Sequence, residues 1–192
     1  RQMCIRDRDI VVASVLGVAC GFVFLGWNAV GYAWYEAMDA LTPGLGGLAT
    51  GIWLLGGILG GLVIRKPGAA VYVEVLAATV SAVLGSQWGI STLYSGLAQG
   101  IGVEIILAIF MYRQFNLGVT ILAGMAAGWG AFVLELFTSG NLAKSFEFNV
   151  IYLVTLTISG AILAGALGFY LVKALAKTGA LDRFAVGREQ RA

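Results

Sequence analysis

Apolar stretches of roughly 20 residues recur along the whole chain and are separated by short polar connections. Each stretch is long enough to cross about 30 Å of hydrocarbon as an α-helix. Of the 192 residues, 59% are hydrophobic and only 11% are charged. Soluble domains have about a quarter of charged residues, so a bilayer must cover this much apolar surface. The sequence therefore predicts an all-α, polytopic membrane protein.

Six transmembrane helices are expected, because six apolar segments lie between breaker residues. Pro43 and Pro67 begin the second and third segments, where proline costs least because the first backbone donors of a helix are unpaired. The expected helices are Asp9–Gly31, Pro43–Ile64, Pro67–Leu84, Thr92–Tyr112, Leu117–Phe137 and Asn149–Ala174.

The basic residues predict the orientation of these helices. If the spans alternate, one side of the membrane receives Arg65, Lys66, Arg113, Lys173, Lys177, Arg183, Arg188 and Arg191. The other side carries Lys144 together with the acidic Glu36, Asp39 and Glu147. The side rich in lysine and arginine is cytoplasmic under the positive-inside rule. We therefore expect both termini in the cytoplasm of a bacterial cell and the helices in its plasma membrane.

Three segments are expected along the chain. Residues 1–8 resemble the translation of a common sequencing adapter, so we expect a non-native or disordered start there and give it no function. Residues 9–175 form the six-helix transmembrane domain, and residues 176–192 form a cytoplasmic C-terminal tail. The first apolar run lacks an Ala-x-Ala cleavage site, so it is expected to stay in the membrane.

Motifs for catalysis, ATP hydrolysis and metal binding are not found in the sequence. There is no Gly-x-x-x-x-Gly-Lys-Ser/Thr loop, and there is no histidine, the commonest general acid–base and a frequent metal ligand. The two cysteines, Cys4 and Cys20, do not form a zinc motif. We therefore expect a transport subunit and not an enzyme, with no cofactor, no metal and no nucleic-acid partner.

Three carboxylates fall within the expected spans, namely Glu74, Glu104 and Glu135. An unpaired carboxylate in hydrocarbon costs at least about 2.5 kcal/mol, so each should face a cavity or a polar partner. All three are candidates for ligand binding. The alternative is a protonated or hydrogen-bonded carboxyl group that only joins helices.

Aromatic and amide side chains gather at the outer ends of the expected helices. They are Trp27, Asn28, Tyr32, Trp34, Tyr35, Gln87, Trp88, Tyr94 and Gln99. Such a set suits a flat heteroaromatic ligand, which stacks on the rings while its edge is hydrogen-bonded. The alternative for the aromatic members is an interfacial belt that needs no ligand.

On the fourth expected helix, one face carries Tyr94, Leu97, Ile101 and Glu104. This spacing predicts that Tyr94 and Glu104 line one cavity while Gln99 points elsewhere. Lys144 is the only basic residue expected in the outer half, so a cationic or neutral ligand is favoured over an anion. The alternative is the general scarcity of basic residues on that side of a membrane.

Small residues recur at a spacing of four on several expected helices, which lets helix backbones approach closely. Most of these stripes are expected to pack within the chain. The stripe on the first helix, formed by Ala13, Gly17 and Gly21, is assigned to the surface that docks a partner subunit.

Three segments together carry a family resemblance. They are Gly51-Ile-Trp53 through Ile64-Arg-Lys-Pro-Gly-Ala-Ala70, Val83-Leu-Gly-Ser-Gln-Trp-Gly89, and Leu97-Ala-Gln-Gly-Ile-Gly-Val-Glu104 leading into Met111-Tyr-Arg113. These segments resemble the YkoE family, the substrate-binding S components of energy-coupling factor (ECF) transporters for thiamine and its hydroxymethylpyrimidine precursor. The resemblance extends from Asp9 to the closing segment Ala174-Leu-Ala-Lys-Thr-Gly179, with Val103 in place of an expected alanine.

This resemblance implies a six-helix S component that binds the vitamin from the outside. It also implies docking on a transmembrane coupling subunit that is driven by cytoplasmic ATPase subunits. In related S components a small-residue motif on the first helix faces the coupling protein, and this motif corresponds to Ala13 and Gly17 here.

Thiamine also agrees with the chemistry of the candidate residues, because an aminopyrimidine suits carboxylates and amides while a thiazolium cation suits aromatic rings. We assign Glu104, with Gln99 or Gln87, to the pyrimidine edge. We expect the ligand rings to stack on Trp27, Trp88 and Tyr94, and we expect Asn28 to orient the ligand. The candidate set is completed by Tyr32, Glu74 and Glu135.

Two alternatives stay open from the sequence alone. An ion-coupled carrier for a small cationic or heteroaromatic nutrient would use Glu104 and Glu74 as a proton relay. A membrane enzyme that acts on lipids is disfavoured because no catalytic pair of residues is visible.

Overall fold

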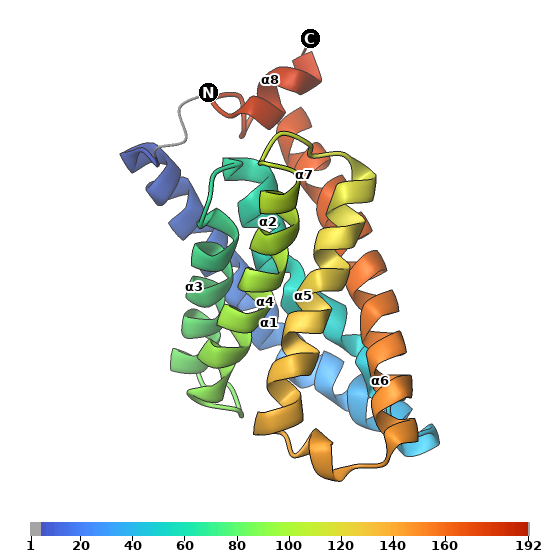
Figure 1. The fold of residues 1–192 in the computed structure, drawn as a ribbon. Coiled ribbons are helices and arrows are strands. Elements are labelled where there is room, and N and C mark those ends of the chain that lie inside the picture. The colour runs from blue at the N-terminus through green and yellow to red at the C-terminus, as the bar shows by residue number, and fades with distance from the viewer. Residues whose placement is uncertain (1–4, 192) are drawn as a thin grey trace.

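All regular elements among residues 5–191, the part of the chain that the computed structural model describes, are helices (Figure 1). They are α1 (Asp7–Leu41), η1 (Leu45–Leu54), α2 (Leu55–Ile64), α3 (Ala69–Val83), α4 (Ser91–Ile109), α5 (Leu117–Thr138), η2 (Asn141–Ala143), α6 (Phe146–Ser159), η3 (Gly160–Ala166), α7 (Leu167–Lys177) and α8 (Ala185–Arg191). The segments η1 and η2 are 3₁₀ helices, and η3 is a π-helical segment between α6 and α7. The predicted all-α class is confirmed.

Five helical stretches in the described residues are long and apolar enough to cross a membrane. They are Asp7–Leu41, Leu45–Ile64, Ser91–Ile109, Leu117–Thr138 and Phe146–Lys177. The third expected span corresponds to α3, which has only 15 residues and a length of about 22 Å. It packs between α1 and α4 inside the same bundle (Figure 1).

The first helix is longer than predicted, since α1 continues past Gly31 to Leu41. Residues 32–41 contain no proline or glycine, and the chain leaves the helix only at Thr42, directly before Pro43. Tyr32 and Tyr35, which the sequence placed after the helix, therefore lie on its last turns. This extension brings two aromatic rings to the end of the bundle.

The two prolines lie just before helices and not in their first turns. Pro43 precedes η1, which begins at Leu45, and Pro67 precedes α3, which begins at Ala69. In both cases a glycine follows the proline with a positive φ, +98° at Gly44 and +84° at Gly68. Because glycine has no Cβ, it accepts this left-handed conformation at little cost.

Close backbone contacts between glycine-bearing helices hold the bundle together. A Cβ atom added at Gly102 on α4 would lie 2.2 Å from the Ala126 carbonyl oxygen of α5, and one added at Gly124 on α5 would lie 2.2 Å from the Gly160 carbonyl oxygen. Such contacts are typical of membrane bundles, where dispersion replaces the hydrophobic drive.

The small-residue stripe on α1 also packs inside the chain. Ala13, Gly17 and Gly21 are buried, and Cβ atoms added at Gly17 and Gly21 would collide with Leu76 and Val80 of α3. The stripe thus seats α3 against α1 and is not exposed for a partner subunit. Its spacing identified a close helix contact, but spacing does not tell which helix provides the other side.

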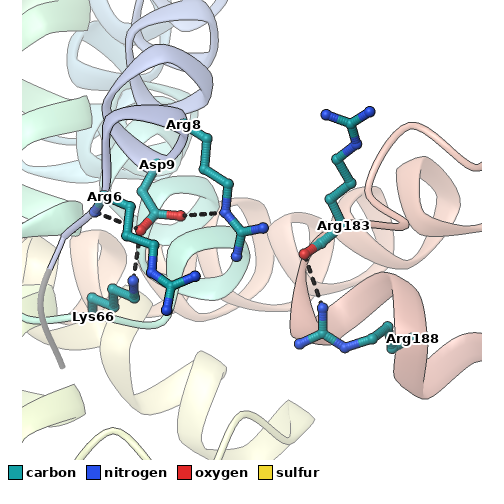
Figure 2. A network of polar contacts seen from close by, with 6 residues as sticks. All are labelled: Arg6, Arg8, Asp9, Lys66, Arg183 and Arg188. Atoms are coloured by element: carbon teal, nitrogen blue, oxygen red, sulfur yellow. Dashed lines mark hydrogen bonds and ion pairs between the residues drawn. The ribbon is translucent and has the colours of Figure 1, made fainter. Parts of the chain in front are cut away.

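The start of α1 is fixed to the turn between α2 and α3 by Asp9 (Figure 2). The buried Asp9 carboxylate pairs with Lys66 Nζ at 2.6 Å and with Arg8 Nε at 3.6 Å, and it accepts a hydrogen bond from the Arg6 backbone N–H at 2.9 Å. Of the segment 1–8, residues 1–4 lie outside the described residues, and the helix already begins at Asp7.

The start of α1, the α2–α3 turn, the α4–α5 loop and α8 lie at one end of the bundle, which we call the terminal end (Figure 1). The end of α1, the α3–α4 turn and the α5–α6 turn lie at the opposite end. At the terminal end, Arg65 Nη1 contacts the Glu189 carboxylate at 2.6 Å, which ties α8 to the α2–α3 turn.

Candidate ligand-binding cavity

A cavity of about 290 Å³ extends from the opposite end into the bundle. Helices α1, α3, α4, α5 and α6 line it together with η1 and η2. Exposed residues such as Trp88, Ser139 and Lys144 lie at its mouth, whereas the buried Asn28, Glu74 and Gln99 lie deeper. Its size is near the lower limit of small-molecule sites in proteins.

The inner part of the cavity is built around Glu74 on α3, whose residue is 1% exposed. One carboxylate oxygen, Oε2, accepts a hydrogen bond from the Gly57 backbone N–H at the start of α2. The other oxygen, Oε1, accepts from Gln99 Nε2 at 3.1 Å. The carboxylate is thus satisfied by hydrogen bonds and has no basic partner among these contacts.

Gln99 on α4 connects Glu74 to two other groups. In the amide orientation that pairs all of its polar atoms, Nε2 also donates to the Trp53 carbonyl at 3.1 Å, and Oε1 accepts from Ser95 Oγ at 2.8 Å. Gly96 lets α4 approach this closely, because a Cβ atom there would lie 2.7 Å from Ala78 Cβ of α3.

Asn28 on α1 fixes the indole ring of Trp53. Its Oδ1 accepts from Trp53 Nε1 at 2.8 Å, and its Nδ2 donates to Ser81 Oγ on α3 at 3.1 Å. Both ends of the amide are therefore used, and α1, η1 and α3 are joined at one side of the cavity.

Five aromatic rings follow one another around the cavity. Trp53 and Trp88 meet edge to face at 5.5 Å, and Trp88 meets Tyr32 in the same way at 5.4 Å. Tyr32 stacks on Tyr35 at 6.1 Å, and Tyr35 meets Tyr152 edge to face at 6.4 Å. Edge-to-face packing holds each ring in place and leaves π-faces for a ligand.

The wall formed by α5, η2 and α6 carries a second acidic group. Tyr152 Oη donates to Glu135 Oε2 at 2.6 Å. Near the mouth, Lys144 Nζ lies 4.0 Å from the centre of the Phe148 ring. Asn141 also lines the cavity, and its buried Oδ1 has no hydrogen-bond partner among the described residues. An unpaired buried acceptor is expected to bind water or a ligand.

Six of the ten predicted binding residues line this cavity. They are Asn28, Tyr32, Glu74, Trp88, Gln99 and Glu135. The sequence did not select Trp53, Tyr152 or Ser95. Trp53 carried a usable signal, because it is an indole within a segment of glycine and aliphatic residues, whereas Tyr152 and Ser95 lie in ordinary apolar helices.

The structure places the other four predicted residues away from the cavity. Trp27 Nε1 donates to the Ala49 carbonyl at 2.8 Å, and Gln87 is exposed in the α3–α4 turn. Tyr94 is 56% exposed on the outside of α4. Glu104 accepts hydrogen bonds from the Ala70 backbone N–H at 2.8 Å and from Tyr112 Oη, so it caps the start of α3.

The prediction of which face of the fourth helix lines the cavity was therefore wrong. Leu97 and Ile101, which share a face with Tyr94, are more than 40% exposed, whereas Gln99 is buried. The glycine-bearing side of α4 packs on α3, which turns the aliphatic side outward.

Comparison with known proteins places the chain in a family. Residues 8–130 match the family described as "ABC-type cobalt transport system, permease component". A protein of Bacillus subtilis (strain 168) named HMP/thiamine permease protein YkoE is 35% identical over 188 residues, which cover 96% of this chain and 91% of that protein. A crystal structure of an S-component of an ECF transporter matches with a TM-score of 0.83 and 32% identity, over 98% of this chain and 94% of the other.

These relatives are transport proteins, which confirms the assignment to a transport subunit and not to an enzyme. The helical architecture and the apolar spans agree with a multi-pass protein of the bacterial plasma membrane. The chain therefore belongs to the YkoE family of substrate-binding S components of ECF transporters.

Proposed function

We propose that this chain captures thiamine or its hydroxymethylpyrimidine precursor in the cavity and passes it to partner subunits of an ECF transporter. The observation that carries the proposal is the convergence of a buried carboxylate, an amide and five aromatic rings on one cavity. The name of the Bacillus subtilis relative supports the choice of ligand.

The inner part of the cavity suits the aminopyrimidine ring. Its amino group would donate to the Glu74 carboxylate, and a ring nitrogen would accept from Gln99 Nε2. A thiazolium cation would then lie between the aromatic rings, where ring faces and the Glu135 carboxylate favour positive charge. Asn28 would act indirectly, because it holds the Trp53 ring in position.

A cobalt ion fits this cavity less well, although the matching family is described by cobalt transport. The described residues contain no group of three or more His, Cys, Asp or Glu side chains that could hold a metal ion. Divalent cobalt is usually bound by imidazole, thiolate or several carboxylate ligands. The carboxyl groups and aromatic rings instead favour an organic cation.

The topology proposed for this function has six spans, with α3 as the short third span and both termini in the cytoplasm. Basic residues of the α2–α3 turn, the α4–α5 loop and α7 all lie at the terminal end, which supports this orientation. The cavity then opens to the outside. A transmembrane coupling subunit and cytoplasmic ATPases would supply the energy.

The proposal is tested by equilibrium binding of thiamine and hydroxymethylpyrimidine to the detergent-purified chain, followed by tryptophan fluorescence. Trp53 and Trp88 line the cavity, so saturable quenching is expected. Glu74→Gln should weaken binding about tenfold or more, because a hydrogen bond to a charged group contributes roughly 1.5–3 kcal/mol. Glu104→Gln is the matched control and should bind within about twofold of the unaltered chain, since that carboxylate lies outside the cavity.

Failure of both compounds to bind would refute the vitamin assignment. Equal losses in Glu74→Gln and Glu104→Gln would show that the affinity depends on the general stability of the bundle and not on this cavity. Competition by cobalt(II) at stoichiometric concentrations would favour the metal instead.

A further inference from the structure

The ten-residue 3₁₀ helix η1 is an unusual element, because 3₁₀ runs longer than three or four residues are uncommon and often mark a hinge. It crosses the bundle between Gly44 and α2 and carries Thr50 and Trp53 to the cavity. Its overwound backbone must be stabilised by contacts from outside the segment, since an α-helix of the same residues has better hydrogen-bond geometry.

Side chains from α1 and α6 hold the residues from Gly44, just before η1, to Gly51 in its middle. Thr155 Oγ1 donates to the Gly44 carbonyl, and Ser159 Oγ donates to the Leu48 carbonyl, both at 2.8 Å. Ser159 Oγ also accepts from the Gly51 N–H at 2.8 Å, and Trp27 Nε1 donates to the Ala49 carbonyl at 2.8 Å. Four contacts thus fix this segment to its neighbours.

The end of η1 and the start of α2 are held by the residues proposed to bind the ligand. The Trp53 carbonyl accepts from Gln99 Nε2, and the Gly57 N–H donates to Glu74 Oε2. Gly57 follows Trp53 by four residues, so in an α-helix these two groups would bond to each other. In this structure α2 begins only at Leu55. The side chains of Gln99 and Glu74 bind these two backbone groups instead.

We propose that a ligand bound at Glu74 and Gln99 releases the Trp53 carbonyl and the Gly57 N–H to bond to each other, so that the last turn of η1 rewinds into an α-helix continuous with α2. This inference rests on the proposed function of the cavity. Both hydrogens of Gln99 Nε2 are already used, by Glu74 and by Trp53, so a ligand acceptor must displace one of them. A buried carbonyl without a partner is costly, and the Gly57 N–H is four residues away along the chain.

Rewinding shortens the segment, since a 3₁₀ helix rises about 2.0 Å per residue and an α-helix about 1.5 Å. The change is about 2 Å if the last four residues rewind while Thr155, Ser159 and Trp27 keep their contacts with the earlier residues. The far end of α2 carries Arg65 and Lys66, which pair with Glu189 and Asp9 (Figure 2 shows the Lys66 pair). Occupancy of the cavity is thereby transmitted to the terminal end.

The experiment measures the distance between spin labels at Thr42→Cys and Pro67→Cys, two exposed positions that flank η1 and α2. The chain carries Cys4→Ser and Cys20→Ala so that only these sites are labelled. Pulsed dipolar spectroscopy is recorded without ligand and with saturating thiamine or hydroxymethylpyrimidine. The double variant Glu74→Leu/Gln99→Leu, which can neither accept from the Gly57 N–H nor donate to the Trp53 carbonyl, is measured without ligand, and Glu104→Gln is the control.

The expected result is a mean distance about 2 Å shorter in the ligand-free double variant than in the unaltered chain, and the same shortening when ligand binds the unaltered chain. Glu104→Gln should keep the long distance. If the double variant does not fold, Glu74→Met/Gln99→Met replaces it, because methionine has no hydrogen-bond donor and only a weak acceptor.

An unchanged distance in the ligand-free double variant would overturn the proposal, and so would saturable binding to the unaltered chain without any shortening. If neither compound binds, the proposed function fails separately. The double variant then decides the behaviour of η1 alone, since that measurement needs no ligand.

Discussion

Asn28 joins three elements through one amide group, and its removal tests whether the ring positions set the affinity. In Asn28→Ala, the Trp53 N–H and the Ser81 hydroxyl lose their partner. Each unpaired buried group costs about 1–3 kcal/mol, and the Trp53 ring becomes free to turn. We expect about tenfold weaker binding of thiamine, measured by calorimetry on the purified chain.

Tyr94→Ala is the matched control for this measurement, because Tyr94 lies on the outside of α4. Its affinity should equal that of the unaltered chain. Wild-type affinity in Asn28→Ala would show that the orientation of Trp53 does not contribute to binding.

Glu104 illustrates which properties of a single residue can be predicted from the sequence and which cannot. A carboxylate in an apolar helix was correctly expected to find a polar partner, and it does so at Ala70 and Tyr112. Helical spacing grouped Glu104 with Tyr94 in one cavity, whereas Tyr94 is exposed and Glu104 is hydrogen-bonded to Ala70 and Tyr112. The sequence could not predict which face of the helix points into the bundle, because lipid-facing and buried side chains are equally apolar in a membrane protein.

Among the helices, the contact between α4 and α5 depends on the absence of a side chain at Gly102. In Gly102→Ala, the new Cβ would lie 2.2 Å from the Ala126 carbonyl oxygen, so the two helices must separate. We expect a loss of roughly 1–3 kcal/mol or more in stability, seen as a lower Tm in detergent.

Gly26→Ala on α1 is the control, because no atom lies within 4 Å of a Cβ added there. Alanine is a better helix former than glycine by about 1 kcal/mol, so Tm should stay constant or rise. A Gly102→Ala variant as stable as Gly26→Ala would contradict the close contact.

Helix boundaries could be predicted where residues close in sequence determine them. Leu117 was placed correctly as the first residue of α5, where Asn116 Oδ1 accepts from the Val119 N–H. The 3₁₀ form of η1 was not predictable, because it depends on Thr155, Ser159 and Gln99, which are distant in sequence. The length of α1 was missed because Gly31 was taken as its end, although that glycine is buried inside the helix.

For the whole molecule, the six-span topology predicts which loops face the outside. Single cysteines at Gln87 and Leu142, both exposed at the opposite end, should react with a membrane-impermeant maleimide in intact cells. Cysteines at Pro67 and Lys177 should react only after permeabilisation. Equal reactivity of the Gln87 and Pro67 positions would show that α3 does not cross the membrane.

Transport by the complete machine provides the last test, because binding and energy are expected on different subunits. The purified chain in proteoliposomes should bind thiamine but not accumulate it, even when a proton gradient is imposed. Among the described residues, the hydrogen bonds given for Glu74 go to Gly57 and Gln99, and those given for Glu104 go to Ala70 and Tyr112. These two sets of bonds do not connect the two carboxylates into a proton relay. Accumulation should begin when a coupling subunit, ATPase subunits and ATP are added. Uptake by the chain alone that an uncoupler abolishes would instead support an ion-coupled carrier, since only that mechanism draws its energy from the gradient.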